Sequence, residues 1–348
     1  MVTRDPVADL RRIAFLLERA HASTYRVRAF RTAANILAGR DDLDALASGR
    51  GLTKIKGVGD TTARCVLQSL AGEQPAYLRE LEAEAGEPAK GSSIPAIPAL
   101  TGAGAALRAA LRGDCHSHSD WSDGGSPIEE MALTARELGH EYLVLTDHSP
   151  RLSVANGLTA QRLRQQLAVV AQLNTRLAPF LILTGIEVDI LDDGALDQSE
   201  ELLAELDLVV ASVHSKLRMP EAEMTERMLT AVANPHVDVL GHCTGRMVTG
   251  GRKRPESAFD ATAVFEACAE YDVAVEVNCR PERLDPPRRL LRAAVAAGCR
   301  FSVDTDAHAP GQLDWLPYGC ARAAECEVPP DRVINALPAP DLLTWTRD

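Results

Sequence analysis

The chain has 348 residues, of which 46 % are hydrophobic and 25 % are charged, and its formal net charge is -12. This composition excludes a mainly disordered or fibrous protein, and the length favours about two domains. The acidic balance alone argues against a nucleic-acid partner, because phosphates are bound mainly by Lys and Arg. The charge is uneven, however. Residues 1–70 hold 12 basic and 7 acidic residues, a net of +5, whereas residues 71–348 hold 25 and 42, a net of -17.

The cysteine pattern and the hydropathy indicate a protein of the reducing cytoplasm. Eight cysteines occur without a CxxC pair, so we expect unpaired and mostly buried thiols. Residues 1–9 are polar, so we expect no signal peptide. Apolar stretches stay below the roughly 18 residues of a membrane span, so we also expect no membrane contact. The oligomeric state stays open.

The first 85 residues predict a small all-α domain. Leu10, Ile13 and Leu17 follow helical spacing, and residues 25–37 repeat the pattern. The segment LTKIKGVGDTTARCVLQSLA at 52–71 predicts a tight glycine turn and then a helix, with Asp60 as its N-cap. Residues 86–104 are rich in Gly, Pro, Ser and Ala and predict a linker.

Residues 105–348 alternate strand-like and helical patterns. Apolar runs predict strands at 114–118, 142–147, 180–188, 207–213, 237–241, 273–278 and 300–304. Helical patterns lie between them at 127–139, 159–178, 221–233, 257–270 and 286–297. Continuous apolar strands separated by helices are typical of a parallel sheet covered on both faces. We therefore expect an α/β fold with a closed barrel in this domain.

Histidines and carboxylates lie at the ends of the predicted strands. The runs end in DCHSH, TDH, GIEVD, SVH, GH and DTDAH, which hold six of the nine histidines. The C-terminal strand ends of a (β/α) barrel converge on one face, and residues i and i+2 of a strand point to the same side. Imidazole and carboxylate ligands suit Zn, Mn or Fe. The ligands are too many for one tetrahedral ion, so we predict a polynuclear site.

These motifs resemble those of the PHP (polymerase and histidinol phosphatase) superfamily, over residues 113 to about 325. The resemblance implies a distorted (β/α)7 barrel that holds two to three divalent ions and hydrolyses phosphoric esters with a metal-bound water and no protein nucleophile. It implies that His116, His118, Glu187 and Asp306 hold one ion, that Glu187, His214 and His242 hold a second, and that Asp123, His148 and His308 hold a third. Asp120 is an alternative to Asp123.

Basic residues follow several of the same strand ends. Lys216 follows His214 by two residues, and a loop after the fifth strand holds Arg246, Arg252, Lys253 and Arg254. The segment NCRPERLD resembles the Asn-x-x-Pro-x-Arg-Leu-Asp segment of the family. Arginine suits phosphate because of its bidentate fork. The substrate-binding candidates are Lys216, Asn278, Arg280 and Arg283.

The small domain resembles the N-terminal helix-hairpin-helix domain of bacterial family X DNA polymerases. The resemblance implies DNA contacts without sequence readout, and the candidates are Lys54, Lys56, Gly57 and Gly59. Glycines let backbone N–H groups approach a phosphate. A linker of about 20 residues stands where those polymerases have their palm, so we expect no nucleotidyl transfer. A lyase lysine cannot be assigned.

Two functions follow from these features, and a third is disfavoured. The first is a DNA phosphoesterase, either a 3′-5′ exonuclease or an end-processing repair enzyme. The alternative is a phosphomonoesterase of the histidinol-phosphatase type that acts on a small phosphorylated metabolite. A DNA-binding module with a vestigial barrel is disfavoured because every expected ligand position holds a competent residue. The appended small domain favours DNA as the partner.

Overall fold

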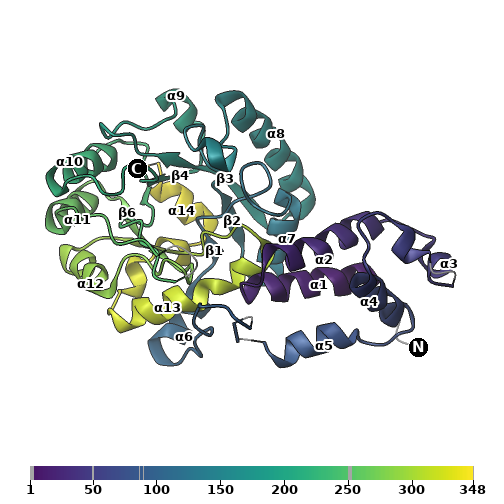
Figure 1. Cartoon of the computed structure of the whole chain (residues 1–348). Coiled ribbons are helices and arrows are strands. Elements are labelled where there is room, and N and C mark those ends of the chain that lie inside the picture. The colour runs from purple at the N-terminus through teal and green to yellow at the C-terminus, as the bar shows by residue number, and fades with distance from the viewer. Residues whose placement is uncertain (1–3, 49–50, 86, 89, 250–252, 348) are drawn as a thin grey trace. The chain divides into compact units, whose positions relative to one another are not determined.

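A computed structural model describes residues 4–48, 51–85, 87–88, 90–249 and 253–347. The chain divides into two compact units, Met1–Ile97 and Pro98–Asp348 (Figure 1). The division falls inside the predicted linker 86–104, of which residues 86 and 89 lie outside the described residues. Helix α6, Gly102–Ala110, begins within that predicted linker.

The first unit is helical, as the sequence predicts. Its helices are α1 (Pro6–Arg19), α2 (Thr24–Leu37), α3 (Leu43–Ser48), α4 (Asp60–Leu70) and α5 (Ala76–Ala83), with a 3-10 turn at Leu52–Lys54. Helix α1 packs against α2, α4 and α5. Its Leu10 and Ile13 are fully buried, and a buried ion pair joins Glu18 to Arg31 of α2 at 2.6 Å.

The glycine turn before α4 has the geometry that only glycine adopts easily. Gly57 has a φ of 97°, and a Cβ there would lie 2.5 Å from the Ile36 side chain. Asp60 was predicted as the N-cap, and this is wrong by one residue. Gly59 is the N-cap and Asp60 is the first helical residue. The extended backbone of Gly59 already brings the chain into the helix, and Asp60 lies in the first turn, where the helix dipole favours a carboxylate.

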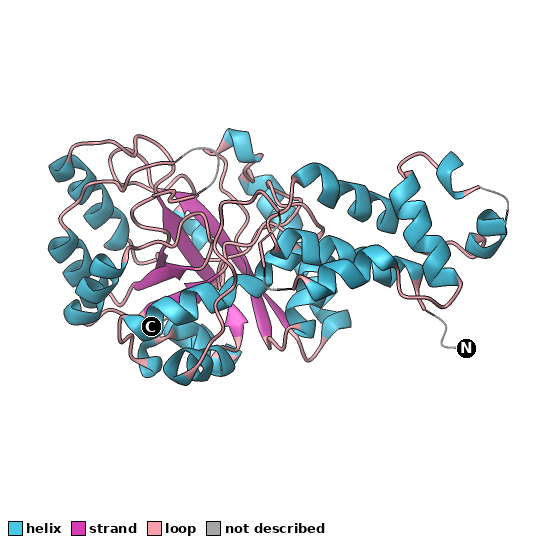
Figure 2. Ribbon diagram, turned by 60° about the horizontal axis from the view of Figure 1, so that its bottom comes forward, coloured by secondary structure: helices cyan, strands magenta, loops and turns pink. Residues whose placement is uncertain are grey.

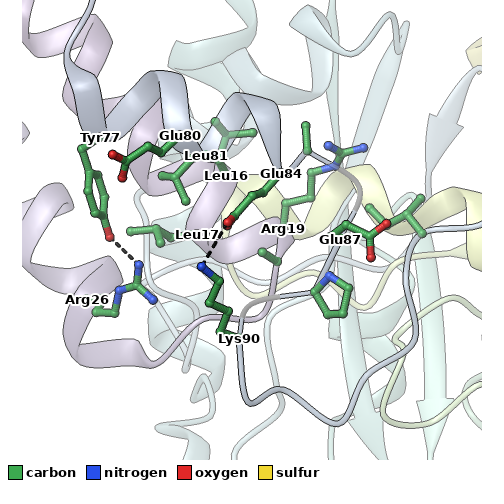
Figure 3. Close-up of a pocket in the computed structure, with 14 residues that line it drawn as sticks. Leu16, Leu17, Arg19, Arg26, Tyr77, Glu80, Leu81, Glu84, Glu87 and Lys90 are labelled. Carbon is green, nitrogen blue, oxygen red and sulfur yellow. Dashed lines mark hydrogen bonds and ion pairs between the residues drawn. The ribbon is translucent and has the colours of Figure 1, made fainter.

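The first unit contains a cavity of about 270 Å³ beside α1 and α5 (Figure 3). Arg26 donates to the Tyr77 hydroxyl, and the Lys90 ammonium lies 3.3 Å from a Glu84 oxygen. Two of the three cations on this cavity, Arg26 and Lys90, are therefore held by these groups of the chain itself.

The second unit is built on a parallel sheet in the strand order β1 to β7. The strands are β1 (Gly113–Asp114), β2 (Tyr142–Leu145), β3 (Leu181–Asp189), β4 (Leu208–Ser212), β5 (Val239–Leu240), β6 (Ala274–Asn278) and β7 (Phe301–Asp304). Each strand pairs in parallel with the next along the chain. Figure 2 shows the strands with helices around them. The helices are α6, α7 (Ile128–Glu137), α8 (Ala160–Leu177), α9 (Glu200–Leu203), α10 (Glu221–Val232), α11 (Ala261–Glu270), α12 (Arg288–Ala297), α13 (Leu316–Glu325) and α14 (Ala339–Trp345).

Side-chain contacts bring β1 and β7 together and make the barrel nearly closed. The Cys115 N–H donates to Asp304 at 2.8 Å, and the Thr305 hydroxyl donates to Asp114. A parallel bridge joins Ser117 to Ala307 just beyond the two strands. Burial raises the pKa of Asp114 to about 6, against the hydrogen bonds that it accepts. The predicted seven-membered barrel of PHP type is confirmed.

Strands β1 and β2 end earlier than predicted, on the side that carries the histidines. The prediction ran β1 to residue 118 and β2 to residue 147, whereas their pairing stops at Asp114 and Leu145. Beyond these points the pairing continues only as isolated parallel bridges, such as those of Ser117 with Ala307 and of His148 with Glu187. Helix α11 begins at 261 rather than 257, because the Asp260 side chain caps it by accepting from two backbone N–H groups.

The cysteine prediction is confirmed, since all eight thiols are free and buried. Among the described residues, no helix combines the length and the apolar composition needed to cross a membrane.

Candidate metal centre

The structure brings all nine predicted metal ligands into one cluster at the C-terminal strand ends. Strand β3 itself carries Glu187, and the other ligands lie in the loops that follow β1, β2, β4, β5 and β7. Each loop is positioned by a buried apolar strand, so its first residues enter the barrel mouth in a fixed direction. The cluster therefore depends on six separate segments of the chain.

Glu187 lies at the centre of the cluster. Its Oε1 is 2.9 Å from His242 Nε2 and 3.3 Å from His214 Nε2. Its Oε2 is 2.8 Å from His148 Nδ1 and 3.3 Å from His116 Nε2. The His118 ring lies 3.6 Å away. One carboxylate therefore faces five imidazoles, and only 1 % of the residue is exposed.

A second carboxylate joins the outer part of the cluster. Asp123 Oδ1 is 3.3 Å from His308 Nε2 and 3.5 Å from His148 Nε2. Asp120, the alternative, is exposed and belongs to none of the candidate ligand groups. The geometry therefore places Asp123 rather than Asp120 beside these histidines.

Three groups of side chains have donor atoms close enough to hold an ion. They are His118 with Asp123, His148 and His308; His116 with His118 and Glu187; and His148 with Glu187 and His214. The grouping implied by the family resemblance differs from these three groups. It pairs His148 only with Asp123 and His308, whereas the structure also places His148 beside Glu187. The structure also adds His118 to the group of Asp123, and His242 and Asp306 belong to none of the three groups.

The donor atoms fit divalent cations. Nitrogen atoms of His116, His118, His214 and His242 are buried and have no hydrogen-bond partner among the described residues. Leaving buried polar atoms unpaired costs free energy, so such a set needs a further partner. Nitrogen and oxygen donors around a carboxylate form the ligand set that Zn, Mn or Fe accepts.

The cluster is electrostatically coupled. Burial disfavours the charged form of His116, but Glu187 and Glu276 outweigh it and raise the pKa of His116 well above its usual value. Burial likewise opposes ionisation of Glu187, yet His116 and the other imidazoles hold the pKa of Glu187 well below its usual value. The centre therefore favours an ionised Glu187, which is the form that binds a cation.

Two supporting carboxylates were missed by the sequence analysis. Glu276 of β6 lies 2.7 Å from His116 Nδ1 and accepts a hydrogen bond from the backbone N–H of His242. Asp189 lies 3.4 Å from His214 Nδ1. Carboxylates that contact the far nitrogen of a ligand histidine fix its orientation. Glu276 lies two residues before Asn278 in β6, and this strand spacing was the available signal.

Three of the four substrate-binding candidates lie around Asp306. The Asn278 amide donates to Asp306 Oδ2 at 3.2 Å, and Arg283 Nε is 3.3 Å from the same oxygen. Arg280 Nη1 is 3.6 Å from Asp306 Oδ1. Lys216 is placed differently, because its exposed ammonium pairs with Asp192 at 2.6 Å. Arg252 lies outside the described residues.

The predicted DNA-contacting residues lie together on the surface of the first unit. Lys54 ends the 3-10 turn, Lys56 and Gly57 follow, and Gly59 precedes α4. All four are exposed.

The thiols near the metal centre are not poised to react. Cys115 and Cys243 are buried, and burial raises the pKa of both thiols well above the usual value. A thiol that stays protonated is a poor nucleophile.

Family comparisons agree with this architecture. Residues 114–280 match the PHP domain family, and residues 2–74 match a helix-hairpin-helix domain family. The fold and site thus define a PHP-type barrel protein. This chain carries a PHP domain in its barrel and a helix-hairpin-helix domain before it.

Similar proteins divide into two kinds. The DNA polymerase/3'-5' exonuclease PolX of Bacillus subtilis is 40 % identical over 232 residues, which cover 67 % of this chain but 40 % of that protein. A probable phosphatase of Thermoanaerobacter sp. is 29 % identical over 206 residues, which cover 56 % of this chain and 78 % of that protein. Among solved structures, histidinol phosphate phosphatase of Lactococcus lactis, complexed with zinc, L-histidinol and phosphate, aligns with a TM-score of 0.45. It is 20 % identical and covers 61 % of this chain and 92 % of its own.

Proposed function

We propose that this protein is a metal-dependent phosphoesterase that hydrolyses DNA, as a 3′-5′ exonuclease or a 3′-end-processing enzyme. The observation that carries the proposal is the buried carboxylate of Glu187 facing five histidines at the mouth of a PHP barrel. Such a donor set serves to hold cations, and clustered cations serve phosphoryl chemistry.

Two to three divalent ions would be held by the nine clustered side chains. Glu187 would help to hold more than one ion, because each of its oxygens faces a different set of histidines. His118 and Asp306 would join the ion near His116, since their side chains lie 3.5 Å apart. When bound, such ions polarise the phosphoryl group and lower the pKa of water. The side chains of the cluster would fix the positions of the ions, and so of the positive charge that faces the phosphate.

The basic side chains beside Asp306 would bind and orient the phosphate. The Arg283 side chain is 15 % exposed at the edge of the cluster, and Arg280 Nη1 lies 3.1 Å from His308 Nδ1. Arginine in such a site offers paired donors in the geometry of a phosphate. Asn278 would hold the Asp306 carboxylate in place through its amide donor. Burial of Cys115 and Cys243 leaves the hydrolysis without a thiol nucleophile.

DNA is favoured as the substrate by the first unit. Residues 2–74 match a helix-hairpin-helix family, and the exposed Lys54 and Lys56 come just before the glycine turn. The name of the Bacillus subtilis relative includes a 3'-5' exonuclease activity. This chain spans 40 % of that protein's length, so the activity is carried over here only as a proposal.

The second candidate is a phosphomonoesterase for a small metabolite. It is favoured by the probable phosphatase of Thermoanaerobacter sp., since this chain spans 78 % of that protein's length. That alignment covers 56 % of this chain. The helix-hairpin-helix domain then has no role in catalysis, which makes this candidate the weaker one.

One assay separates the two candidates. Protein purified without chelator is analysed for bound metal and then incubated with Mn²⁺ and 3′-labelled duplex DNA. Parallel reactions contain histidinol phosphate or nucleoside monophosphates, and a control contains EDTA. We expect shortening or 3′-dephosphorylation of DNA that EDTA abolishes. Phosphate release from the small esters with intact DNA would overturn the proposal in favour of the second candidate.

A further inference from the structure

A cationic cavity of about 470 Å³ lies beside the metal centre of the barrel unit. It is formed by the loops that follow β4, β5 and β6. Its lining residues are Leu217, Arg218, Met247, Lys253, Arg254, Pro255 and Arg283. Four of these side chains are basic, and none is acidic.

Arg283 connects this cavity to the proposed phosphate site. Its side chain lines the cavity, and its Nε lies 3.3 Å from Asp306 Oδ2. The other oxygen of Asp306 lies 3.5 Å from His118 Nε2 within the metal centre. One arginine therefore separates the cavity from the cluster, so a substrate bound at the cluster can extend into the cavity.

Among the described residues, one of the four cations of the cavity pairs with a carboxylate, namely Arg283 with Asp306. Among the described residues, Arg218 and Lys253 form no ion pair, and both are exposed. Arg254 donates to the Gly245 carbonyl, and burial together with the charge of Arg283 lowers its pKa. The nearby Lys216, by contrast, is paired with Asp192. This unbalanced positive charge lies in an acidic unit, which marks the cavity as a site for an anion.

The remaining walls of the cavity are apolar. Leu217, Met247 and Pro255 supply them, and a Cβ at Gly245 would meet the Leu217 side chain at 2.7 Å. A free inorganic anion makes no use of such walls. A nucleotide does, because its sugar and base bring apolar surface beside a charged phosphate.

We propose that this cavity binds the nucleotide next to the reacting phosphate in a nucleic-acid strand, with Arg218 and Lys253 contacting the phosphate of that nucleotide. This inference rests on the proposed function, because it assumes that the reacting phosphate is bound at the metal centre. It also gives a physical reason for preferring a strand to a small metabolite. A phosphomonoester with one phosphate has no second anion for the cavity.

The test compares the wild type with Arg218→Ala/Lys253→Ala and with a charge-matched control, Arg136→Ala/Arg292→Ala. The control arginines are exposed and lie on α7 and α12, outside the cavity. Binding of a fluorescein-labelled 12-nucleotide single strand is measured by anisotropy in EDTA at several salt concentrations. Turnover of p-nitrophenyl phosphate, which has one phosphate, is measured with Mn²⁺.

We expect the cavity variant to bind the single strand about tenfold more weakly, with a salt dependence shallower by about 0.7, since the two side chains contact one phosphate and each phosphate contact on a single strand contributes about 0.7. Its kcat and KM for p-nitrophenyl phosphate stay within twofold of the wild type, and the control changes neither property. Unchanged strand binding, or equal weakening in the control, would overturn the inference. A matching loss on p-nitrophenyl phosphate would also overturn it, because the residues would then act at the reacting phosphate. If the wild type cleaves no phosphate ester, the proposed function fails, while the binding data still decide whether the cavity holds a strand.

Discussion

The two units of this protein build their candidate sites in opposite ways. In the helix-hairpin-helix unit, the predicted DNA contacts lie within residues 54–59, and they are exposed. In the barrel, the candidate ligands run from His116 to His308, and most are buried. A phosphate-contacting turn needs only local backbone geometry and a nearby cation. A multi-ion centre needs many donors around one point, which only a closed fold provides.

The two units also differ in their charge. The first 70 residues carry a net charge of +5, with 12 basic and 7 acidic residues, and the cations at the turn are exposed. The barrel unit contains buried carboxylates at its centre, among them Glu187, Glu276 and Asp306. Cations bound there would neutralise part of the acidic charge that the formal count assigns to the chain. The overall charge of -12 therefore does not exclude a DNA partner.

The largest expected effect is that of Glu187→Gln, which changes the centre of the candidate metal site in the barrel. The amide keeps the shape of the side chain but removes the charge that faces five histidines. We expect bound metal and phosphoesterase activity to fall by at least about 100-fold. Loss of a carboxylate that only supports a ligand costs up to about 100-fold, and Glu187 is itself a predicted ligand. Elemental analysis and turnover of p-nitrophenyl phosphate measure this. Full metal content in a folded variant would contradict the central role of Glu187.

Glu276→Gln tests a carboxylate that supports the ligand histidines of the metal centre. Glu276 contacts His116 Nδ1 and accepts from the backbone N–H of His242, so the amide would loosen the ring orientation of His116 and the backbone at His242. We expect metal affinity to fall about 10-fold to 100-fold, as is usual for such partners. Competition with a chromogenic chelator measures the affinity. The exposed Glu266→Gln on α11 is the control and should bind metal like the wild type.

Lys54→Ala/Lys56→Ala tests the predicted DNA contacts beside the glycine turn and should leave the barrel unaffected. We expect duplex DNA binding to weaken about tenfold and its salt dependence to become shallower by about 1.8, since each duplex phosphate contact contributes about 0.9. Turnover of p-nitrophenyl phosphate should be unchanged. Arg79→Ala/Lys90→Ala removes the same charge from other exposed positions of the unit. Equal losses in both double variants would mean that net charge alone, and not the turn, binds DNA.

His140→Leu has the smallest expected effect and concerns stability away from the site. His140 is buried, both ring nitrogens lack a hydrogen-bond partner, and burial, aided by Arg108, lowers its pKa to about 3. As the pH falls below 6.5, the unfolded chain therefore takes up a proton that the folded protein excludes, and stability falls. At pH 5 this costs about 2 kcal/mol.

His140→Leu should not show the loss of stability at pH 5 that His140 causes in the wild type. Urea unfolding at pH 7 and pH 5 measures the difference, and His236→Asn at a partly exposed site is the control. Parallel declines in the wild type and in His140→Leu would contradict the assignment.

The sequence by itself determined the identity of the elements and the chemistry of the centre. Apolar runs located all seven strands, because a strand covered on both faces needs continuous apolar residues. The histidines were recognised because they follow those runs at positions where a parallel barrel gathers its strand ends. The alternating spacing of His116 and His118 already favoured a shared ion.

Only the tertiary structure decided how the donors are grouped and what supports them. The position of His148 between Asp123 and Glu187, the contact of Glu276 with His116, and the pairing of Lys216 with Asp192 all join segments far apart in the chain. Spacing along one strand predicts which side chains share a face, but not which side chains of other strands they meet. Those contacts are fixed by strand register and by the closure of β1 onto β7 through Asp114 and Asp304.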